Sequence, residues 1–244
     1  MGDPLLVVHR LRFAYPNGKL ALDGIELEIN ATEKVALLGP NGAGKSTLIQ
    51  HLNGLLSGEG NVRVAGLPVE RGHLREIRRR VGILFQDPDD QLFCPTLEED
   101  VAFGPQNFGV PEDKLKARVD SALEAVGMTA HRHNAPFQMS FGERKRAALA
   151  TVLACQPELL ALDEPSSNLD PFHRRRLINW MRQYPKAILL ATHDLDLALD
   201  TTERAILLTD GKIVADDATE IILRDRNLLE KHGLELPLRL QCNA

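Results

Sequence analysis

The segment Gly39-Pro40-Asn41-Gly42-Ala43-Gly44-Lys45-Ser46-Thr47 decides the fold that this chain can adopt. Glycines at this spacing let successive backbone N–H groups turn inward around phosphate oxygens. The lysine that follows can reach the β- and γ-phosphates of a nucleotide, and the serine hydroxyl can ligate Mg²⁺. We therefore predict a phosphate-binding loop, with nucleotide contacts from Asn41, Gly42, Gly44, Lys45, Ser46 and Thr47.

The residues on either side of this loop favour a strand and a helix. Residues 35–38 (Val-Ala-Leu-Leu) are typical of a short buried strand, and residues 47–52 can begin a helix. A strand, a loop and a helix in that order place the positive helix end, worth roughly half an elementary charge, against the phosphates. The alternative is a glycine-rich turn with a chance lysine, and the strand and helix expected on either side make this alternative unfavourable.

Composition narrows the class of protein. The 244 residues are enough for one large α/β domain, or for one domain with an inserted lobe. With 29 Lys and Arg against 34 Asp and Glu, the net charge of −5 offers no basic field for nucleic acid. The sequence shows neither a run of about 18 apolar residues nor a signal peptide, so we expect a soluble intracellular protein. Cys94, Cys155 and Cys242 form no C-x-x-C pair and are expected to be reduced thiols.

Two polar residues follow apolar runs that we interpret as buried strands. Gln86 comes after residues 81–85 (Val-Gly-Ile-Leu-Phe), and His193 comes after residues 187–192 (Ala-Ile-Leu-Leu-Ala-Thr). Open α/β sheets bind ligands at the carboxyl ends of their strands, so Gln86 could contact Mg²⁺ or an attacking water. His193 could sense the γ-phosphate. Strand-end capping by Gln86 and a purely structural role for a lone histidine are the alternatives.

Two adjacent carboxylates, Asp163 and Glu164, end a third apolar run at residues 159–162. Such a pair is unfavourable unless a cation is present, and the phosphate loop supplies the reason for one. The first carboxylate can hold Mg²⁺ through its water shell. The second can orient or deprotonate an attacking water, and a positioned base contributes on the order of 10²- to 10⁴-fold in rate.

The remaining segments indicate strands at both ends of the chain and helices in the middle. Residues 5–30 alternate like β-structure around the turn signal Pro16-Asn17-Gly18. Tyr15, just before that turn, could stack on adenine; an ordinary edge-strand aromatic is the alternative. Residues 205–214 predict a hairpin with an Asp-Gly turn. Residues 219–240 predict one or two short helices and an extended Leu-Pro-Leu tail.

Residues 87–154 lack a buried parallel strand and carry several helical patterns, so we interpret them as an inserted helical lobe. Two positions in this lobe have the form of a capping box, in which a hydroxyl residue and a glutamate three positions later satisfy each other's backbone donors. One is Thr96 with Glu99, and the other is Ser140 with Glu143.

The joint order of these motifs resembles the nucleotide-binding subunit of ATP-binding-cassette (ABC) transporters over almost the whole chain. The features are Tyr15, the phosphate loop, Gln86, the Ser140 helix start, Asp163-Glu164, the turn at residues 167–170, and His193. The resemblance implies an α/β fold: a P-loop NTPase (RecA-like) core with an N-terminal antiparallel β-subdomain and an inserted α-helical subdomain. Within one domain, residues 1–86 and 155–215 would form the core with its β-subdomain, 87–154 the helical signature subdomain, and 216–244 a C-terminal helical tail.

The same resemblance implies an ATPase that uses ATP and Mg²⁺. It assigns adenine stacking to Tyr15, phosphate and Mg²⁺ contacts to Lys45, Ser46 and Gln86, metal support to Asp163, the general base to Glu164 and the γ-phosphate switch to His193. Ser140 and Gly142 would come from the opposite subunit of a head-to-tail dimer. Both sites look complete if the chain pairs with itself, which favours a homodimer over a heterodimer with a related ATPase.

Three segments narrow the resemblance to the ATPases of energy-coupling-factor importers, which take up cobalt, nickel or vitamins. They are residues 86–96 (Gln-Asp-Pro-Asp-Asp-Gln-Leu-Phe-Cys-Pro-Thr), 98–105 (Glu-Glu-Asp-Val-Ala-Phe-Gly-Pro) and 233–237 (Gly-Leu-Glu-Leu-Pro). A stand-alone ATPase of this kind most resembles the CbiO-like cobalt branch. The implied partners are a transmembrane coupling protein and a substrate-binding membrane subunit, with the chain peripheral on the cytoplasmic face of the cell membrane. A vitamin-importing module is one alternative, and a non-transport ABC ATPase acting on nucleic acid is another, although the sequence has no sustained heptads for the coiled coil that this last class needs.

The signature of that family, Leu-Ser-Gly-Gly-Gln, is altered here to Met139-Ser140-Phe141-Gly142-Glu143. Phe141 adds a ring where glycine allows close approach. Glu143 adds a negative charge near a phosphate-facing helix start, unless it folds back as the cap of Ser140. We expect a working site whose turnover is tuned by these changes.

Overall fold

Two sheets carry the fold of residues 3–241, the part of the chain that the computed structural model describes. The larger sheet has six strands in the order β10-β9-β3-β8-β7-β6. They are β3 (Lys34–Leu38), β6 (Val81–Leu84), β7 (Leu159–Asp163), β8 (Ala187–Thr192), β9 (Arg204–Thr209) and β10 (Lys212–Ala218). The smaller sheet has four strands in the order β2-β1-β4-β5. They are β1 (Leu6–Ala14), β2 (Leu20–Ile29), β4 (Glu59–Val64) and β5 (Leu67–Pro68).

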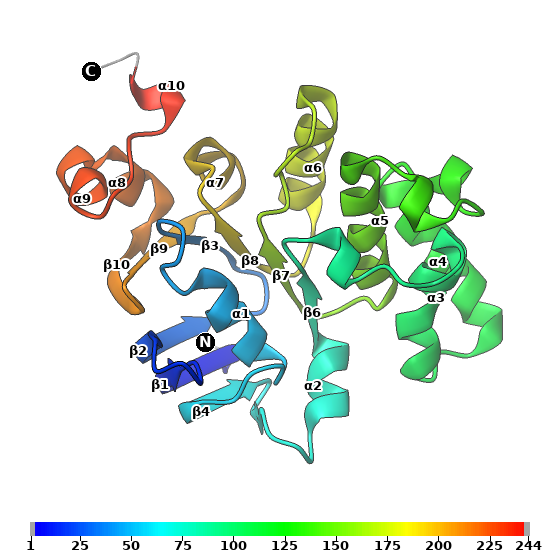
Figure 1. Ribbon diagram of the computed structural model, residues 1–244, viewed down its shortest axis with the longest axis horizontal. Helices are drawn as coiled ribbons and strands as arrows, with labels where there is room; N and C mark the ends of the chain where they lie inside the picture. Colours follow the sequence, from blue (N-terminus) through cyan, green and yellow to red (C-terminus); the bar gives the residue numbers. More distant parts are fainter. Residues whose placement is uncertain (1–2, 242–244) are drawn as a thin grey trace.

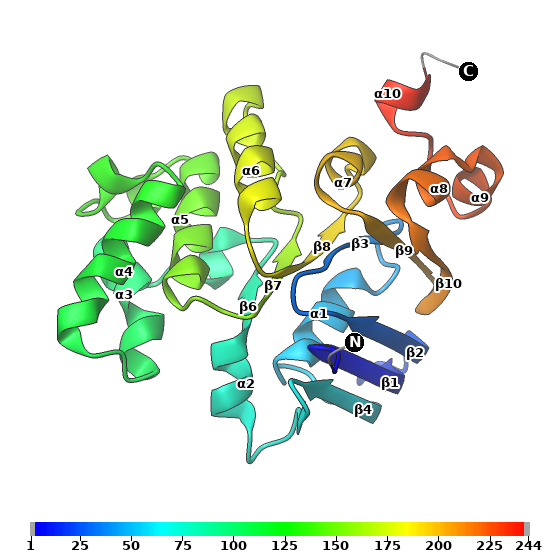
Figure 2. The ribbon, with the colours of Figure 1, turned by 180° about the vertical axis from the view of Figure 1, so that it is seen from behind.

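Helices surround the larger sheet, and three of them stand apart as a lobe beyond its β6 edge (Figures 1 and 2). The lobe helices are α3 (Leu97–Asn107), α4 (Glu112–Ala125) and α5 (Phe141–Ala154), with short 3₁₀ turns at Pro88–Asp90, Thr129–His131 and Pro136–Gln138. The other helices are α1 (Lys45–Leu52), α2 (Leu74–Arg80), α6 (Pro171–Gln183), α7 (Leu195–Thr201), α8 (Thr219–Arg224), α9 (Arg226–Lys231) and α10 (Leu238–Gln241). Within residues 3–241, no helix has the length and apolarity needed to cross a bilayer.

The register of the parallel strands brings the predicted site residues to one edge of the sheet. Leu38 of β3 pairs with Thr192 of β8, and Asp163 of β7 pairs with Ala191 of the same strand. Every residue of β7 and β8 is buried, which explains why both read as continuous apolar runs. The segments that follow β3, β6, β7 and β8 therefore leave the sheet at the same side.

Both predicted capping boxes are present, at the starts of α3 and α5. The Asp210-Gly211 turn joins β9 and β10 with both residues in the left-handed region, at φ 49° and 74°, as a type I′ hairpin turn requires. Strand β10 continues to Ala218, so it extends past residue 215, where we place the end of the core. That division of the chain stays an interpretation.

Strand β1 (Leu6–Ala14) agrees with the β-like alternation of residues 5–30, and a register shift next to Arg10, which has φ 49°, interrupts that alternation. One detail of the predicted elements was wrong. Leu238 begins the short helix α10 and does not continue an extended tail, because Asp196 accepts hydrogen bonds from the N–H groups of Leu238 and Arg239. Cys242 and the last residues of the predicted tail lie outside the described residues.

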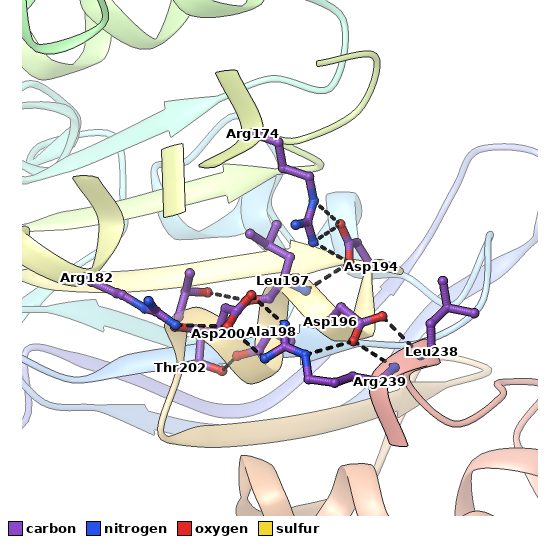
Figure 3. A network of polar contacts seen from close by, with 11 residues as sticks. Arg174, Arg182, Asp194, Asp196, Leu197, Ala198, Asp200, Thr202, Leu238 and Arg239 are labelled. Atoms are coloured by element: carbon purple, nitrogen blue, oxygen red, sulfur yellow. Dashed lines mark hydrogen bonds and ion pairs between the residues drawn. The ribbon is translucent and has the colours of Figure 1, made fainter. Parts of the chain in front are cut away.

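Arginine–aspartate pairs attach this C-terminal segment to α7 (Figure 3). Arg239 forms two hydrogen bonds with the carboxylate of Asp200, at 3.1 and 2.8 Å, and Arg182 of α6 bonds to the same carboxylate at 2.9 Å. The hydrogen bond from Arg239 holds the pKa of the Asp200 carboxyl below its usual value. One aspartate on α7 thus joins α6 to the tail.

A buried lysine ties the lobe to the large sheet. Lys145 of α5 is 1% exposed, and its ammonium donates to the carbonyl oxygens of Gln86 at 2.6 Å and Phe85 at 3.1 Å. A longer contact of 3.4 Å reaches the carbonyl oxygen of Asp163. Burial lowers the pKa of Lys145 to about 8, while the charges of Asp163 and Glu164 oppose that shift. The helix that begins at Ser140 is therefore fixed to the ends of β6 and β7.

We predict that the Arg239→Ala variant releases the C-terminal segment without unfolding the domain. Exposed ion pairs contribute about 0–1 kcal/mol, so Tm should fall by no more than about 4 °C. Amide hydrogen exchange of residues 234–241, followed by mass spectrometry, should become faster. Arg226→Ala, which removes an exposed pair with Glu230 in α9, is the matched control. Unchanged exchange in residues 234–241 would show that Arg239 does not hold the tail.

We also predict a pH signature for Lys145. Its folded-state pKa of about 8 lies below the usual lysine pKa of 10.5, so the unfolded chain binds more protons between these two pH values and stability rises with pH there. The free energy of unfolding can be measured in urea for the natural chain and for Lys145→Gln from pH 7 to 10.5. The natural chain should become more stable relative to the variant as pH rises. A difference that does not vary with pH would contradict the assignment.

Candidate nucleotide-binding site

A pocket of about 390 Å³ opens at the carboxyl edge of the large sheet. It gathers residues from the β1–β2 hairpin, the phosphate loop and the ends of three strands. Its lining consists of Tyr15, Lys19, Ala21, Asn41, Gly42, Gly44, Lys45, Ser46, Thr47, Gln86, Asp163, Glu164 and His193. Every predicted site residue except Ser140 and Gly142 is among them, and those two lie at the start of α5.

The phosphate loop needs its glycines for close packing. A Cβ on Gly39 would lie 2.1 Å from the carbonyl oxygen of Leu208, and one on Gly44 would lie 2.6 Å from that of Ala21. Gly44 also has φ 111°, a conformation that side chains disfavour. Helix α1 begins immediately afterwards at Lys45, so its first N–H groups, which lack helical partners, border the pocket.

Lys45 places a buried cation in this loop. Its ammonium donates to the carbonyl oxygens of Gly39 at 2.6 Å and Pro40 at 3.0 Å. Burial lowers the pKa of Lys45, and the nearby carboxylates of Glu164 and Asp163 raise it. A buried ammonium beside open N–H groups forms an anion site that suits a phosphate chain.

Asp163 and Ser46 supply oxygen atoms next to the loop. Burial raises the pKa of Asp163, and a hydrogen bond with Ser46 opposes that shift. Among residues 3–241 there is no cluster of three His, Cys, Asp or Glu that could hold a metal alone. Mg²⁺ needs no such cluster, because one or two carboxylates together with phosphate oxygens and water complete its shell. The carboxylate of Asp163, the hydroxyl of Ser46 and the amide oxygen of Gln86 therefore suit Mg²⁺ as oxygen ligands.

Glu164 is held by three donors. Its Oε1 accepts from the backbone N–H of His193 at 2.9 Å and lies 2.8 Å from His193 Nδ1. Its Oε2 accepts from the hydroxyl of Thr192 at 3.0 Å. The backbone of Glu164 has φ 47°, a strained conformation for a glutamate, and strain of this kind is found where function requires it.

Tyr15 is fixed at the opposite rim of the pocket. Its hydroxyl lies 2.8 Å from that of Thr47, and its ring meets Phe13 edge-on with centroids 5.1 Å apart. Lys19 and Ala21 reach the same rim because the hairpin turns back above the phosphate loop. Neither residue was predicted from the sequence, although the turn signal at residues 16–18 could have pointed to them.

The extra carboxylate of the altered signature segment is hydrogen-bonded within the segment itself. Glu143 Oε2 accepts from both the N–H and the hydroxyl of Ser140, at 2.8 Å each, so the glutamate folds back as the helix cap. These bonds hold the pKa of the Glu143 carboxyl below its usual value. The ring of Phe141 lies 5.7 Å from the guanidinium of Arg144 and lines a hollow beside the nucleotide pocket.

Comparison with known proteins agrees with this geometry. Residues 22–167 match the family model described as ABC transporter. A Streptomyces coelicolor protein, named as a candidate ABC transporter ATP-binding protein, is 55% identical over 95% of this chain and 90% of its own length. The energy-coupling factor transporter ATP-binding protein EcfA of Carboxydothermus hydrogenoformans is 44% identical over 95% of this chain and 87% of its own length.

Among solved structures, CbiO1 of Clostridium perfringens, described as part of the ABC transporter complex CbiONQ, superposes with a TM-score of 0.80. It is 34% identical and covers 99% of both chains. An ATP-binding cassette solved as a dimer with ADP and phosphate also reaches 0.80, at 24% identity over 88% of this chain and 98% of its own, and supports the fold alone. The expected α/β fold, with its antiparallel sheet and helical subdomain, is confirmed. The chain belongs to the ABC transporter family and is one of its ATPases.

Proposed function

We propose that this chain is the ATP-hydrolysing subunit of an energy-coupling-factor importer for cobalt or nickel ions. The observation that carries the proposal is the single pocket in which the phosphate loop, Asp163, Glu164 and His193 meet. The similarity to EcfA supports the importer class, and the similarity to CbiO1 supports the metal cargo.

The residues of the pocket divide the work of ATP hydrolysis. The loop N–H groups and Lys45 would bind the phosphates, and Tyr15 would stack on the adenine. Ser46, Gln86 and Asp163 would hold Mg²⁺, which when bound neutralises charge on the transferred phosphoryl group.

Two further residues would act on the reaction itself. Glu164 would accept a proton from the attacking water, because hydrogen bonds from Thr192 and His193 orient its carboxylate at the pocket edge. His193 would contact the γ-phosphate through its imidazole ring, because its side chain is 61% exposed.

A second copy of the chain would complete each site. Ser140 and Gly142 lie at the start of α5, outside the pocket of their own chain. In a head-to-tail dimer, these residues would face the nucleotide of the partner. Because one chain carries both the pocket and the signature segment, a homodimer has two complete sites. Pairing with a related ATPase is the alternative.

The helical lobe carries a surface that suits a membrane partner. Phe93 and Phe103 are 65% and 47% exposed, and their rings pack edge-on with centroids 4.9 Å apart. Phe103 also lines a groove of about 780 Å³ between α3 and α4. We propose that a coupling helix of the transmembrane protein binds at this groove, beside the segment that follows Gln86, and so holds the chain on the cytoplasmic face of the membrane.

We predict that Glu164→Gln reduces ATP turnover by on the order of 10²- to 10⁴-fold, because the amide keeps the size of the side chain but removes the proton acceptor. The variant should still bind ATP and accumulate as an ATP-bound dimer, measured by size-exclusion chromatography with light scattering. Glu158→Gln, a half-exposed carboxylate just before the same strand, is the control. Normal hydrolysis by Glu164→Gln would exclude it as the base.

We further predict that the tagged chain, purified from detergent-solubilised membranes, retains one coupling protein and one metal-binding membrane subunit, identified by mass spectrometry. Replacing Phe93 and Phe103 by Asp should abolish this recovery, because charges cannot be buried under an apolar helix. Ile221→Asp on α8, an exposed apolar residue far from the lobe, should not affect it. Recovery of several interchangeable vitamin-binding subunits would show instead that the chain serves a vitamin-importing module. Recovery of only soluble or DNA-bound proteins would contradict the transport role.

A further inference from the structure

We propose that Thr192 is a positioning residue for hydrolysis, which holds the carboxylate of Glu164 through its hydroxyl. This inference rests on the proposed role of Glu164 as the base. Thr192 is the last residue of β8 and has no exposed surface, so it cannot touch nucleotide itself.

The hydroxyl of Thr192 makes two directed hydrogen bonds. It donates to Glu164 Oε2 at 3.0 Å, and it accepts from the backbone N–H of Asp194 at 3.0 Å. The other residues of β8 that precede it are buried and are all apolar: Ala187, Ile188, Leu189, Leu190 and Ala191. A hydroxyl at the end of such a strand would be unfavourable without partners, and here both partners belong to the site or adjoin it.

Asp194, whose backbone N–H donates to the hydroxyl of Thr192, is itself anchored by contacts in α7 and α6. Asp194 caps α7 by accepting from the N–H of Leu197 at 2.8 Å, and Arg174 of α6 binds its carboxylate with both Nε and Nη2 (Figure 3). The position of the Asp194 N–H is thereby fixed, and it directs the hydroxyl of Thr192 toward Glu164.

The two oxygens of Glu164 consequently differ in how they are held. Oε1 depends in part on the ring of His193, which is largely exposed and free to turn toward a phosphate. Oε2 depends on the hydroxyl of Thr192, which is enclosed. When the histidine ring turns away, Thr192 keeps the carboxylate in place for the water.

The test compares Thr192→Val, which has the same shape without the hydroxyl, with Thr192→Ser, which retains it. Steady-state ATP hydrolysis by the purified full chain with Mg²⁺ should show kcat reduced roughly ten- to a hundredfold in the valine variant, the size expected for one hydrogen bond to a charged group. The KM for ATP should stay within about twofold, because Thr192 lies outside the pocket lining. The serine variant should recover most of kcat.

Serine and alanine differ by a single oxygen atom, so Thr192→Ala against Thr192→Ser repeats the comparison if the valine variant does not fold. The Thr192→Val change should also have no further effect in the Glu164→Gln background, because both act through one carboxylate. A valine variant with the natural kcat, or a serine variant as impaired as valine, would overturn the inference while Glu164→Gln remains inactive. Full activity of Glu164→Gln would instead refute the base assignment on which the inference rests.

Discussion

Two carboxylates, Asp163 and Glu164, are buried next to each other at the end of β7, and the surrounding structure is arranged to hold that charge. Burial of like charges at one place is unfavourable unless cations and donors face them. Burial raises the pKa of Asp163, and the charges of Lys145 from the lobe and Lys45 from the phosphate loop oppose that shift. Glu164 receives its own donors from the end of β8. A divalent cation is the natural complement to such a site, since the two lysines are engaged with carbonyl oxygens.

The lysine from the lobe has a second consequence. Because Lys145 lies on the helix that Ser140 begins, the signature segment and the strand ends share one rigid connection. Its contacts reach the backbone of Gln86 and of Asp163, the residues assigned to Mg²⁺. A rotation of the lobe would therefore either move these carbonyl groups with it or break bonds to a buried ammonium, and the second outcome is expensive. Through this one side chain, a membrane partner bound at the lobe would be coupled to the strand ends that are proposed to hold Mg²⁺.

The parts of the site that are local in sequence could be predicted, and the parts that depend on long-range contacts could not. The phosphate loop, the capping box at Ser140 and the Asp210-Gly211 turn each follow from a few adjacent residues, and the structure has all three. Asp163 and His193 could be placed at strand ends, because buried parallel strands have a recognisable composition. The roles of Lys145 and Thr192 depend on partners in other elements, which strand order and register alone bring into contact.

Helix α7 determines what kind of motion the site can make. At its start, Asp194 is bound by Arg174, and near its end Asp200 is bound by Arg182 and Arg239 (Figure 3). Both ends are thus attached to α6, and the second end is also attached to the C-terminal segment. His193 directly precedes Asp194, the N-cap of α7, so the backbone that carries its ring is fixed. Rotation of the exposed ring breaks one hydrogen bond to Glu164, whereas displacement of the segment would break the bonds to all three arginines as well. The switch proposed for His193 would therefore be a side-chain rotation on a rigid base. The donors on Glu164 that remain, the hydroxyl of Thr192 and the backbone N–H of His193, would then keep the carboxylate oriented.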